Sequence, residues 1–165
     1  MIFYNKTHSN DLYNTLLNLS RNIFFYKKIR LDDTFESRIY LMFIHFSIMM
    51  IIFKKKGEKF SQFSYDSVFH NIENNLRELG FGDVTVNKKM KDLNKLLYDI
   101  LLKINTSKKE TFKLNKVLIL KYFKELQVEK DEEFKEFERY FANFYNFCFD
   151  KPLDNMLREA INFKL

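Results

Sequence analysis

The sequence of 165 residues is poor in the residues that make tight turns and cross-links. It holds three glycines, one proline, one cysteine and no tryptophan. The scarcity of glycine and proline argues against an all-β sandwich or barrel, because such folds need many tight turns. The single cysteine, Cys148, excludes an internal disulfide and fits a reducing compartment. Its neighbourhood, NFYNFCFD, is aromatic, so we expect a buried and inert thiol.

The short motifs of common catalytic and metal sites are also missing. The three histidines, His8, His45 and His70, stand in separate segments, and there is no CxxC, HExxH, P-loop, GxGxxG or GxSxG motif. We therefore expect no metal, no cofactor and no enzymatic activity. An enzyme whose groups assemble only in the fold stays open as an alternative, and a polar pocket would reveal it. We expect His45 to be a hydrogen-bonded core residue.

What the sequence does contain is typical of a globular protein. Hydrophobic residues make up 46% of it and charged residues 30%, a balance that excludes a largely disordered chain. The net charge of +6 permits partners such as nucleic acid, anionic lipid or acidic protein. Lysine, asparagine, isoleucine, phenylalanine and tyrosine are abundant together, as in proteins from AT-rich genomes. We therefore do not use the net charge as a functional clue.

Hydrophobic residues recur at helical spacing along most of the chain. We predict an all-α, single-domain bundle of about six to seven helices over residues 1–165, built around a central hydrophobic helix. Residues 39–53, IYLMFIHFSIMMIIF, are the most apolar segment. They fall short of the ~20 residues that a membrane span needs, so we expect a buried helix. The predicted helices cover about 10–27, 34–53, 63–79, 88–104, 112–127 and 131–147, with a short one after Pro152.

Local signals predict how two of these helices begin and end. Asp33 and Glu36 are spaced as a capping box at the start of the apolar helix. Gly80 follows the last apolar residue of the 63–79 helix, where a left-handed glycine ends helices, and Gly82 would let the chain reverse again. If Asn87 caps the next helix, its first turn holds Lys88, Lys89 and Lys91. Cations are unfavourable there, so the spacing suggests an anion site, with solvated lysines as the alternative.

Two blocks of sequence resemble the ubiquinol–cytochrome c chaperone family. The first is FYKKIRLDDTFESRIYLMFIH, from residue 25, and the second is LRELGFGDVTVNKKMKDLNKLLYD, from residue 76. Asn87 stands where the family usually has proline, and Ser37 and Asp99 stand where glycine is common. The resemblance covers roughly residues 10–105, whereas helices in 109–165 are predicted from periodicity alone. The matching residues are Phe25, Tyr26, Asp33, Thr34, Phe35, Glu36, Arg38, Leu76, Arg77, Glu78, Gly80, Gly82, Asp83, Val86, Lys88, Lys89, Lys91 and Tyr98.

The resemblance implies a helical, non-enzymatic assembly factor for the respiratory ubiquinol–cytochrome c reductase. Mitochondrial members bind newly made cytochrome b, are associated with ribosomes and have a small partner subunit. We see no secretory signal or transit peptide, so we expect a bacterial member. It would act in the cytoplasm at the periphery of the inner membrane, or on the matrix side if it is mitochondrial. Peripheral membrane contact is included in this expectation, and DNA binding is not.

We expect the two blocks to form one surface. Phe25, Tyr26 and Phe35 would contact an apolar client segment, while Gly80 and Gly82 would shape the adjoining corner. Charged residues would order the loops, contact a partner or form internal salt bridges; these are Asp33, Glu36, Arg38, Arg77 and Asp83. Lys88, Lys89 and Lys91 would hold lipid phosphate, ribosomal RNA or acidic protein. An adaptor for ribosomes or other RNA without a cytochrome client, and a dimeric structural subunit, remain the alternatives.

Overall fold

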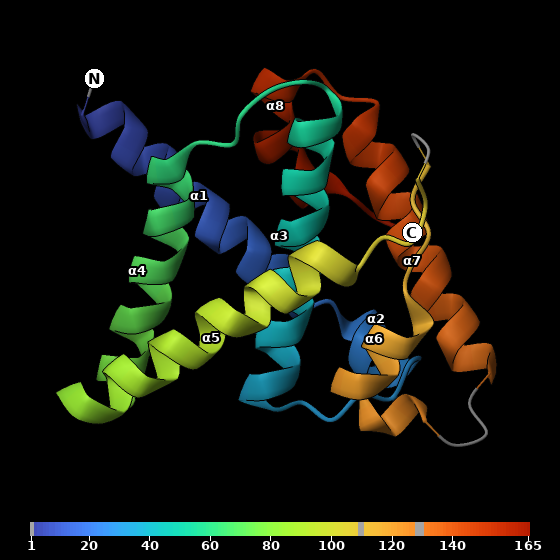
Figure 1. Cartoon of the computed structure of the whole chain (residues 1–165), viewed down its shortest axis with the longest axis horizontal. Helices are drawn as coiled ribbons and strands as arrows, with labels where there is room; N and C mark the ends of the chain where they lie inside the picture. The colour runs from blue at the N-terminus through green and yellow to red at the C-terminus, as the bar shows by residue number, and fades with distance from the viewer. Residues whose placement is uncertain (1, 109–110, 128–130) are drawn as a thin grey trace.

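The computed structural model describes residues 2–108, 111–127 and 131–165, with the backbone alone for residues 2–10. The described residues form helices and loops, plus one isolated antiparallel bridge between Asn105 and Leu114, so the all-α prediction is confirmed (Figure 1). The elements are α1 (Ile2–Ser20), α2 (Ile23–Lys27), α3 (Phe35–Lys55), α4 (Gln62–Glu78), α5 (Asp83–Lys103), α6 (Lys116–Tyr122), α7 (Asp131–Phe149) and α8 (Leu153–Glu159), with 3-10 turns η1 (Lys124–Leu126) and η2 (Ala160–Asn162).

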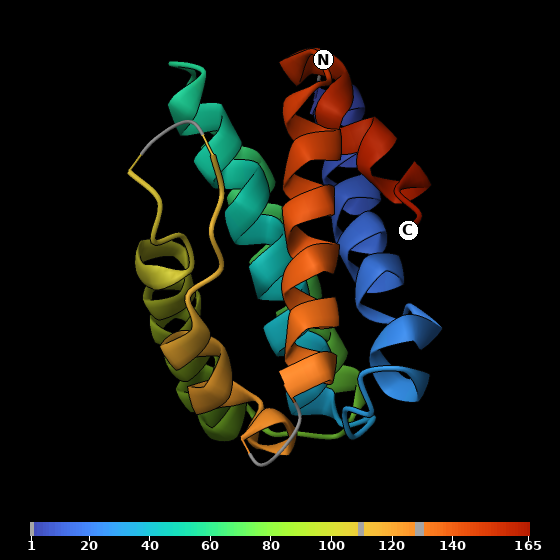
Figure 2. The same ribbon diagram turned by 90° about the vertical axis from the view of Figure 1, so that its right-hand side faces the viewer.

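Helix α3 lies at the centre of the bundle, as expected for the most apolar segment. It contacts α1, α5 and α7, and Figure 2 shows α5 and α6 on one side of it and α1 and α7 on the other. Within the described residues, α3 is the one helix long and apolar enough to cross a membrane. The core helix of a folded domain passes the same test, and 67% of its apolar window is buried here. The burial supports the predicted core helix.

Aromatic rings from α2 and α7 pack around His45 of α3. The ring of Phe25 lies 4.7 Å from that of Tyr140 and 6.0 Å from the imidazole of His45. His45 Nδ1 lies 2.6 Å from the Leu41 carbonyl oxygen, which can only accept, so Nδ1 donates. Nε2 then accepts from the Tyr140 hydroxyl at 2.9 Å. Burial lowers the pKa of His45 to about 3, so the expected core histidine is confirmed and is neutral.

Two predicted helices are shorter or divided in the structure. The first ends at Ser20, because Asn22 has non-helical backbone angles and its side chain accepts from the Phe24 amide to cap α2. The helix expected over 112–127 begins only at Lys116, after Asn115, whose side chain caps α6. It ends at Tyr122, and the 3-10 turn η1 follows. In both cases an asparagine inside the periodic pattern forms a helix cap.

The first and last helices of the chain lie together. Helix α1 packs against α3 and α4 and also contacts α8 and η2. Helix α8 begins directly after Pro152, as predicted, and Pro152 takes its N-cap position. The buried residues of α1, α3, α7 and the C-terminal segment belong to one hydrophobic cluster.

Candidate functional site

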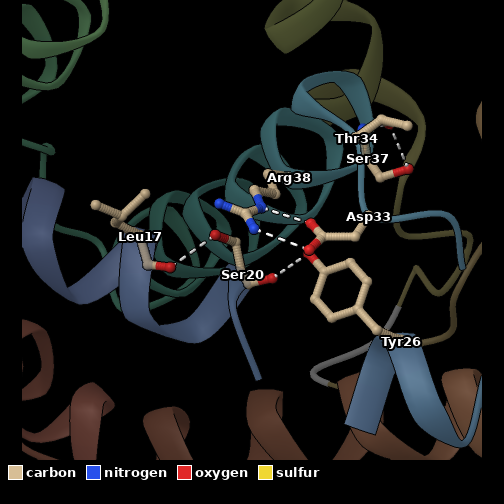
Figure 3. A network of polar contacts seen from close by, with 7 residues as sticks. All are labelled: Leu17, Ser20, Tyr26, Asp33, Thr34, Ser37 and Arg38. Carbon is tan, nitrogen blue, oxygen red and sulfur yellow. Dashed lines mark hydrogen bonds and ion pairs between the residues drawn. The ribbon is translucent and has the colours of Figure 1, made fainter. Parts of the chain in front are cut away.

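The start of α3 differs from the predicted capping box. Thr34, and not Asp33, is the N-cap: its side-chain oxygen accepts from the Ser37 amide at 3.1 Å. Asp33 instead pairs with Arg38 through two parallel hydrogen bonds, Nε to Oδ1 at 2.8 Å and Nη2 to Oδ2 at 3.0 Å (Figure 3). These bonds lower the pKa of the Asp33 carboxyl. The pair therefore fixes the loop that leads into α3.

The two aromatic residues at the start of the first block have different surroundings. Tyr26 is half-buried, and its hydroxyl donates to the Ser20 carbonyl oxygen at 2.6 Å, joining α2 to the end of α1 (Figure 3). Burial raises its pKa. Phe25 has no exposed surface. Its ring belongs to the aromatic core, so we exclude Phe25 from the expected client surface.

The corner between α4 and α5 confirms the prediction for Gly80. This glycine has a φ of +97°, its amide donates to the Arg77 carbonyl at 3.0 Å, and the Phe81 amide donates to the Leu76 carbonyl at 3.3 Å. These two bonds form a Schellman motif, which ends α4. Gly82 has φ near −77° and serves as the N-cap of α5, so it needs no left-handed conformation.

Helix α5 begins about one turn earlier than we predicted. Asp83 and not Lys88 is its first residue, because Gly82 and not Asn87 is the cap. Lys88, Lys89 and Lys91 therefore lie beyond the first turn, and the argument for an anion site at the helix N-terminus is wrong. Asp83 supplies the favourable negative charge there and pairs with Arg77, which also pairs with Glu73 at 3.1 Å. This ion-pair bridge spans the corner.

The two sequence blocks meet in one open pocket of ≈ 310 Å³. The first block contributes four lining residues and the second contributes five. Of the site residues predicted from the sequence, Phe35, Glu36 and Lys89 line this pocket. Four others are paired within their own blocks, Asp33 with Arg38 and Arg77 with Asp83. The full lining consists of Phe35, Glu36, Ile39, Tyr40, Leu76, Lys89, Asp92, Leu93 and Leu96.

The pocket has mostly apolar walls with a few charged groups. Phe35, Leu93 and Leu96 are half-buried, and Glu36 and Asp92 are exposed carboxylates. The Lys89 ammonium lies 4.8 Å from the centre of the Phe81 ring, in cation–π contact at the corner. Such a hollow can accept apolar side chains while carboxylates and a lysine pair with polar groups of a ligand.

Sequence reasoning did not name six of the lining residues as site residues: Ile39, Tyr40, Leu76, Asp92, Leu93 and Leu96. One signal was available on α5, because Lys89, Asp92, Leu93 and Leu96 follow one another at intervals that keep them on one helix face. Lys88 and Lys91 are exposed and do not line this pocket. Of the three predicted lysines, only Lys89 belongs to the pocket.

A second polar cluster joins α5 to α6. Asp99 accepts from Lys121 at 3.0 Å and from the Tyr122 hydroxyl, and it forms an ion pair with Lys103. Hydrogen bonds from Lys103 and Tyr122 hold the pKa of the Asp99 carboxyl well below its usual range. The cluster holds α6 against α5. Its central residue, Asp99, is the one that stands where glycine is common in the family.

Burial raises the pKa of the Cys148 thiol to about 12, as expected for an inert core cysteine. Among the residues that the structure describes, no three histidine, cysteine, aspartate or glutamate side chains are placed to share a metal ion.

Comparison with known proteins identifies the family to which the chain belongs. No curated protein and no solved structure matches the chain significantly. The family model for the ubiquinol-cytochrome C chaperone matches residues 27–143, which begins just after Phe25 and Tyr26 and continues beyond residue 105 into α7. The second block lies inside the match, and so does the first block from Lys27 onward. With this match over most of its length, and with the pocket formed where the two family-like blocks meet, the chain belongs to the ubiquinol-cytochrome C chaperone family.

Proposed function

We propose that this chain is a non-enzymatic assembly chaperone that binds newly made cytochrome b during assembly of ubiquinol–cytochrome c reductase. Membership of the chaperone family supports a role in handling a client protein. The choice of cytochrome b comes from the resemblance of the two sequence blocks. The observation that carries the proposal is the pocket at which these blocks meet.

The pocket suits an apolar segment of a membrane protein before its assembly. Its floor and walls are side chains of Phe35, Ile39, Leu76, Leu93 and Leu96. Ile39 and Leu76 are buried, whereas Phe35, Leu93 and Leu96 keep part of their surface exposed. Burying that surface against apolar client side chains is favourable by about 25 cal/mol per Å². Because the pocket is open, it can receive side chains that project from a helix or an extended segment.

The charged residues of the two blocks hold the pocket walls in place. The Asp33–Arg38 pair fixes the entry to α3, and the Arg77 bridge fixes the turn from α4 to α5. Phe35 lies between the two members of the first pair in the sequence, and Leu76 directly precedes Arg77. Glu36 and Asp92 remain exposed at the pocket and would contact polar groups of the client.

We place the protein in the cytoplasm at the periphery of the inner membrane of a bacterium, or on the matrix side in a mitochondrion. A client inserted into the membrane as it is made supports this location. A ribosome or a small partner subunit would then be a second partner. These are proposals that follow from the family resemblance.

The test is a tagged pull-down from membranes and lysate of the source organism, followed by mass spectrometry. We expect cytochrome b to be enriched over other membrane proteins. The variant Leu93→Asn/Leu96→Asn places two amides in the pocket wall and should abolish that enrichment. The matched control is Leu153→Asn/Leu157→Asn, two half-buried leucines on α8 that lie outside this pocket. Thermal melts must show that both variants fold.

Each outcome distinguishes one function. Loss of cytochrome b with the pocket variant and its retention with the control supports the proposal. Equal retention by both variants would place the client elsewhere and overturn the role of the pocket. Ribosomal proteins without cytochrome b would point to the alternative, an RNA- or ribosome-associated adaptor.

A further inference from the structure

The outer face of α5 carries a straight stripe of exposed residues. Its six members are Val84, Lys88, Lys91, Lys95, Tyr98 and Leu102, separated by four, three, four, three and four positions. At 3.6 residues per turn they fall within an arc of about 80° and extend over about 27 Å. Val84 is 86% exposed, Leu102 77% and Tyr98 55%, and all three lysines are exposed.

The stripe has three positive charges at its centre and no negative charge along its line. In the part of the chain that the structure describes, Lys88, Lys91 and Lys95 form no ion pair or hydrogen bond. The nearest carboxylates of α5, Asp92 and Asp99, lie on the flank that faces α3 and α6, and Asp99 is already paired with Lys103 and Lys121. The three ammonium groups are therefore free to meet an external anion.

The charge pattern and the exposed apolar ends match one surface closely. We propose that the α5 stripe docks on a bilayer that contains anionic phospholipid. Val84 and Leu102 enter the boundary between headgroups and acyl chains. Lysine stems run along the apolar layer while their ammonium groups reach lipid phosphates.

The shape of the stripe favours a flat partner over an inserted peptide. The client pocket is lined by Lys89, Asp92, Leu93 and Leu96, and the pocket between α4 and α5 is lined by Met90 and Asn94. Both hollows open on other sides of α5. The stripe residues line neither hollow, and its apolar ends, Val84 and Leu102, are exposed to solvent. A bilayer surface can bury these side chains without a groove in the protein.

This inference deepens the proposed location and does not depend on cytochrome b. The experiment is flotation of the purified full chain with vesicles of phosphatidylcholine alone or with about one third phosphatidylglycerol. Wild-type protein should bind the anionic vesicles and not the neutral ones, and added salt should weaken binding. Lys88→Gln/Lys91→Gln/Lys95→Gln should weaken it roughly 100-fold.

A matched control removes the same charge from other faces of the molecule. Lys27→Gln/Lys59→Gln/Lys135→Gln takes three exposed lysines from α2, the loop before α4, and α7, and it should bind nearly as tightly as wild type. Val84→Ser/Leu102→Ser keeps every charge and should weaken binding several-fold, because less apolar surface enters the bilayer.

If the stripe variant and the control variant, each lacking three lysines, bind the anionic vesicles with equal affinity, the stripe is not the docking site. Failure of wild-type protein to bind the anionic vesicles would overturn the membrane as its occupant. In that event, stripe-dependent binding to poly-glutamate or to RNA would identify an acidic protein or a nucleic acid as the partner. None of these outcomes bears on the client pull-down, because the pocket and the stripe share no residue.

Discussion

Helices α3 and α5 are each 21 residues long, yet they are used in different ways. Twelve residues of α3 are buried, whereas only Val86, Leu97 and Ile100 are buried in α5. α3 is apolar on nearly every side, because other helices surround it. Helix α5 turns one side to the core, a second to the pocket that both blocks line and a third to solvent. Residues around α3 therefore mainly determine stability, while most of α5 is available for binding.

The comparison separates tests of folding from tests of function. The α4–α5 corner projects at the lower left of Figure 1, away from the aromatic core between α3 and α7. Substitutions in that core should unfold the protein before they reveal a binding defect. Substitutions on the outer side of α5 should alter binding while the melting temperature stays unchanged.

The largest effect is expected in the aromatic core. Phe25→Ala removes a fully buried ring that contacts His45, Phe137, Tyr140 and Phe141. It should lower the free energy of unfolding by about 3–5 kcal/mol, because a cavity replaces the ring. Leu102→Ala on α5 should change it by less than about 0.5 kcal/mol. Urea denaturation of both variants measures the contrast, and similar losses would contradict the division between the two regions.

An intermediate effect is expected from acid. The folded protein keeps His45 neutral down to its pKa of about 3, while the unfolded chain takes up that proton at about pH 6.5. The unfolded state thus binds more protons as pH falls below 6.5, and stability is lost between pH 6.5 and 3. From pH 7 to pH 5 the loss should be roughly 2 kcal/mol.

The variant His45→Gln isolates this contribution. Its unfolding free energy should depend less on pH over that range, although it is lower at pH 7 because the hydrogen bonds to Leu41 and Tyr140 change. Urea midpoints at pH 5, 6 and 7 measure both slopes. If the two slopes are the same, another group accounts for the acid sensitivity.

The smallest effect compares the two glycines of the corner. Gly80→Ala places a Cβ at a φ of +97° and should cost about 1 kcal/mol, although no atom lies within 4 Å of it. Gly82 has an ordinary φ and open space, so Gly82→Ala should cost only a few tenths of a kcal/mol as a weaker cap. Thermal melts of the two variants show which substitution lowers stability more. Reversal of that order would mean that the Schellman motif does not hold the corner.

Predictions that depended on short-range pattern succeeded best. The apolar run of α3 made it the central helix, and Gly80 followed an apolar helix end at the position that a left-handed residue takes. The starts of helices were less certain, because neighbouring residues can each act as a cap. Thr34 caps α3 where Asp33 was predicted to do so, and Gly82 caps α5 where Asn87 was predicted to do so. With Gly82 as the cap, Lys88 lies beyond the first turn of α5. Side-chain chemistry at one position does not decide between such caps.

The candidate site was predicted only in part, because it depends on three helices meeting. Periodicity shows that Leu93 faces inward, but it does not show that α5 lies beside the start of α3. The same limit explains Phe25. A residue that matches a family block can belong to the core or to the surface, and only packing against Tyr140 and Phe141 places its ring in the core.

The contact of α1 with α8 and η2 has a consequence for the order of folding. Synthesis runs from the N-terminus, so α1 emerges from the ribosome before α8 and can pack against α3 and α4 before α8 is made. The surface of α1 that receives α8 and η2 stays uncovered until residues 153–162 have been made. Contacts so distant in sequence form late, because closing the longest loop costs the most entropy. A chain truncated before Leu153 would therefore leave this surface of α1 uncovered and expose its apolar side chains to solvent.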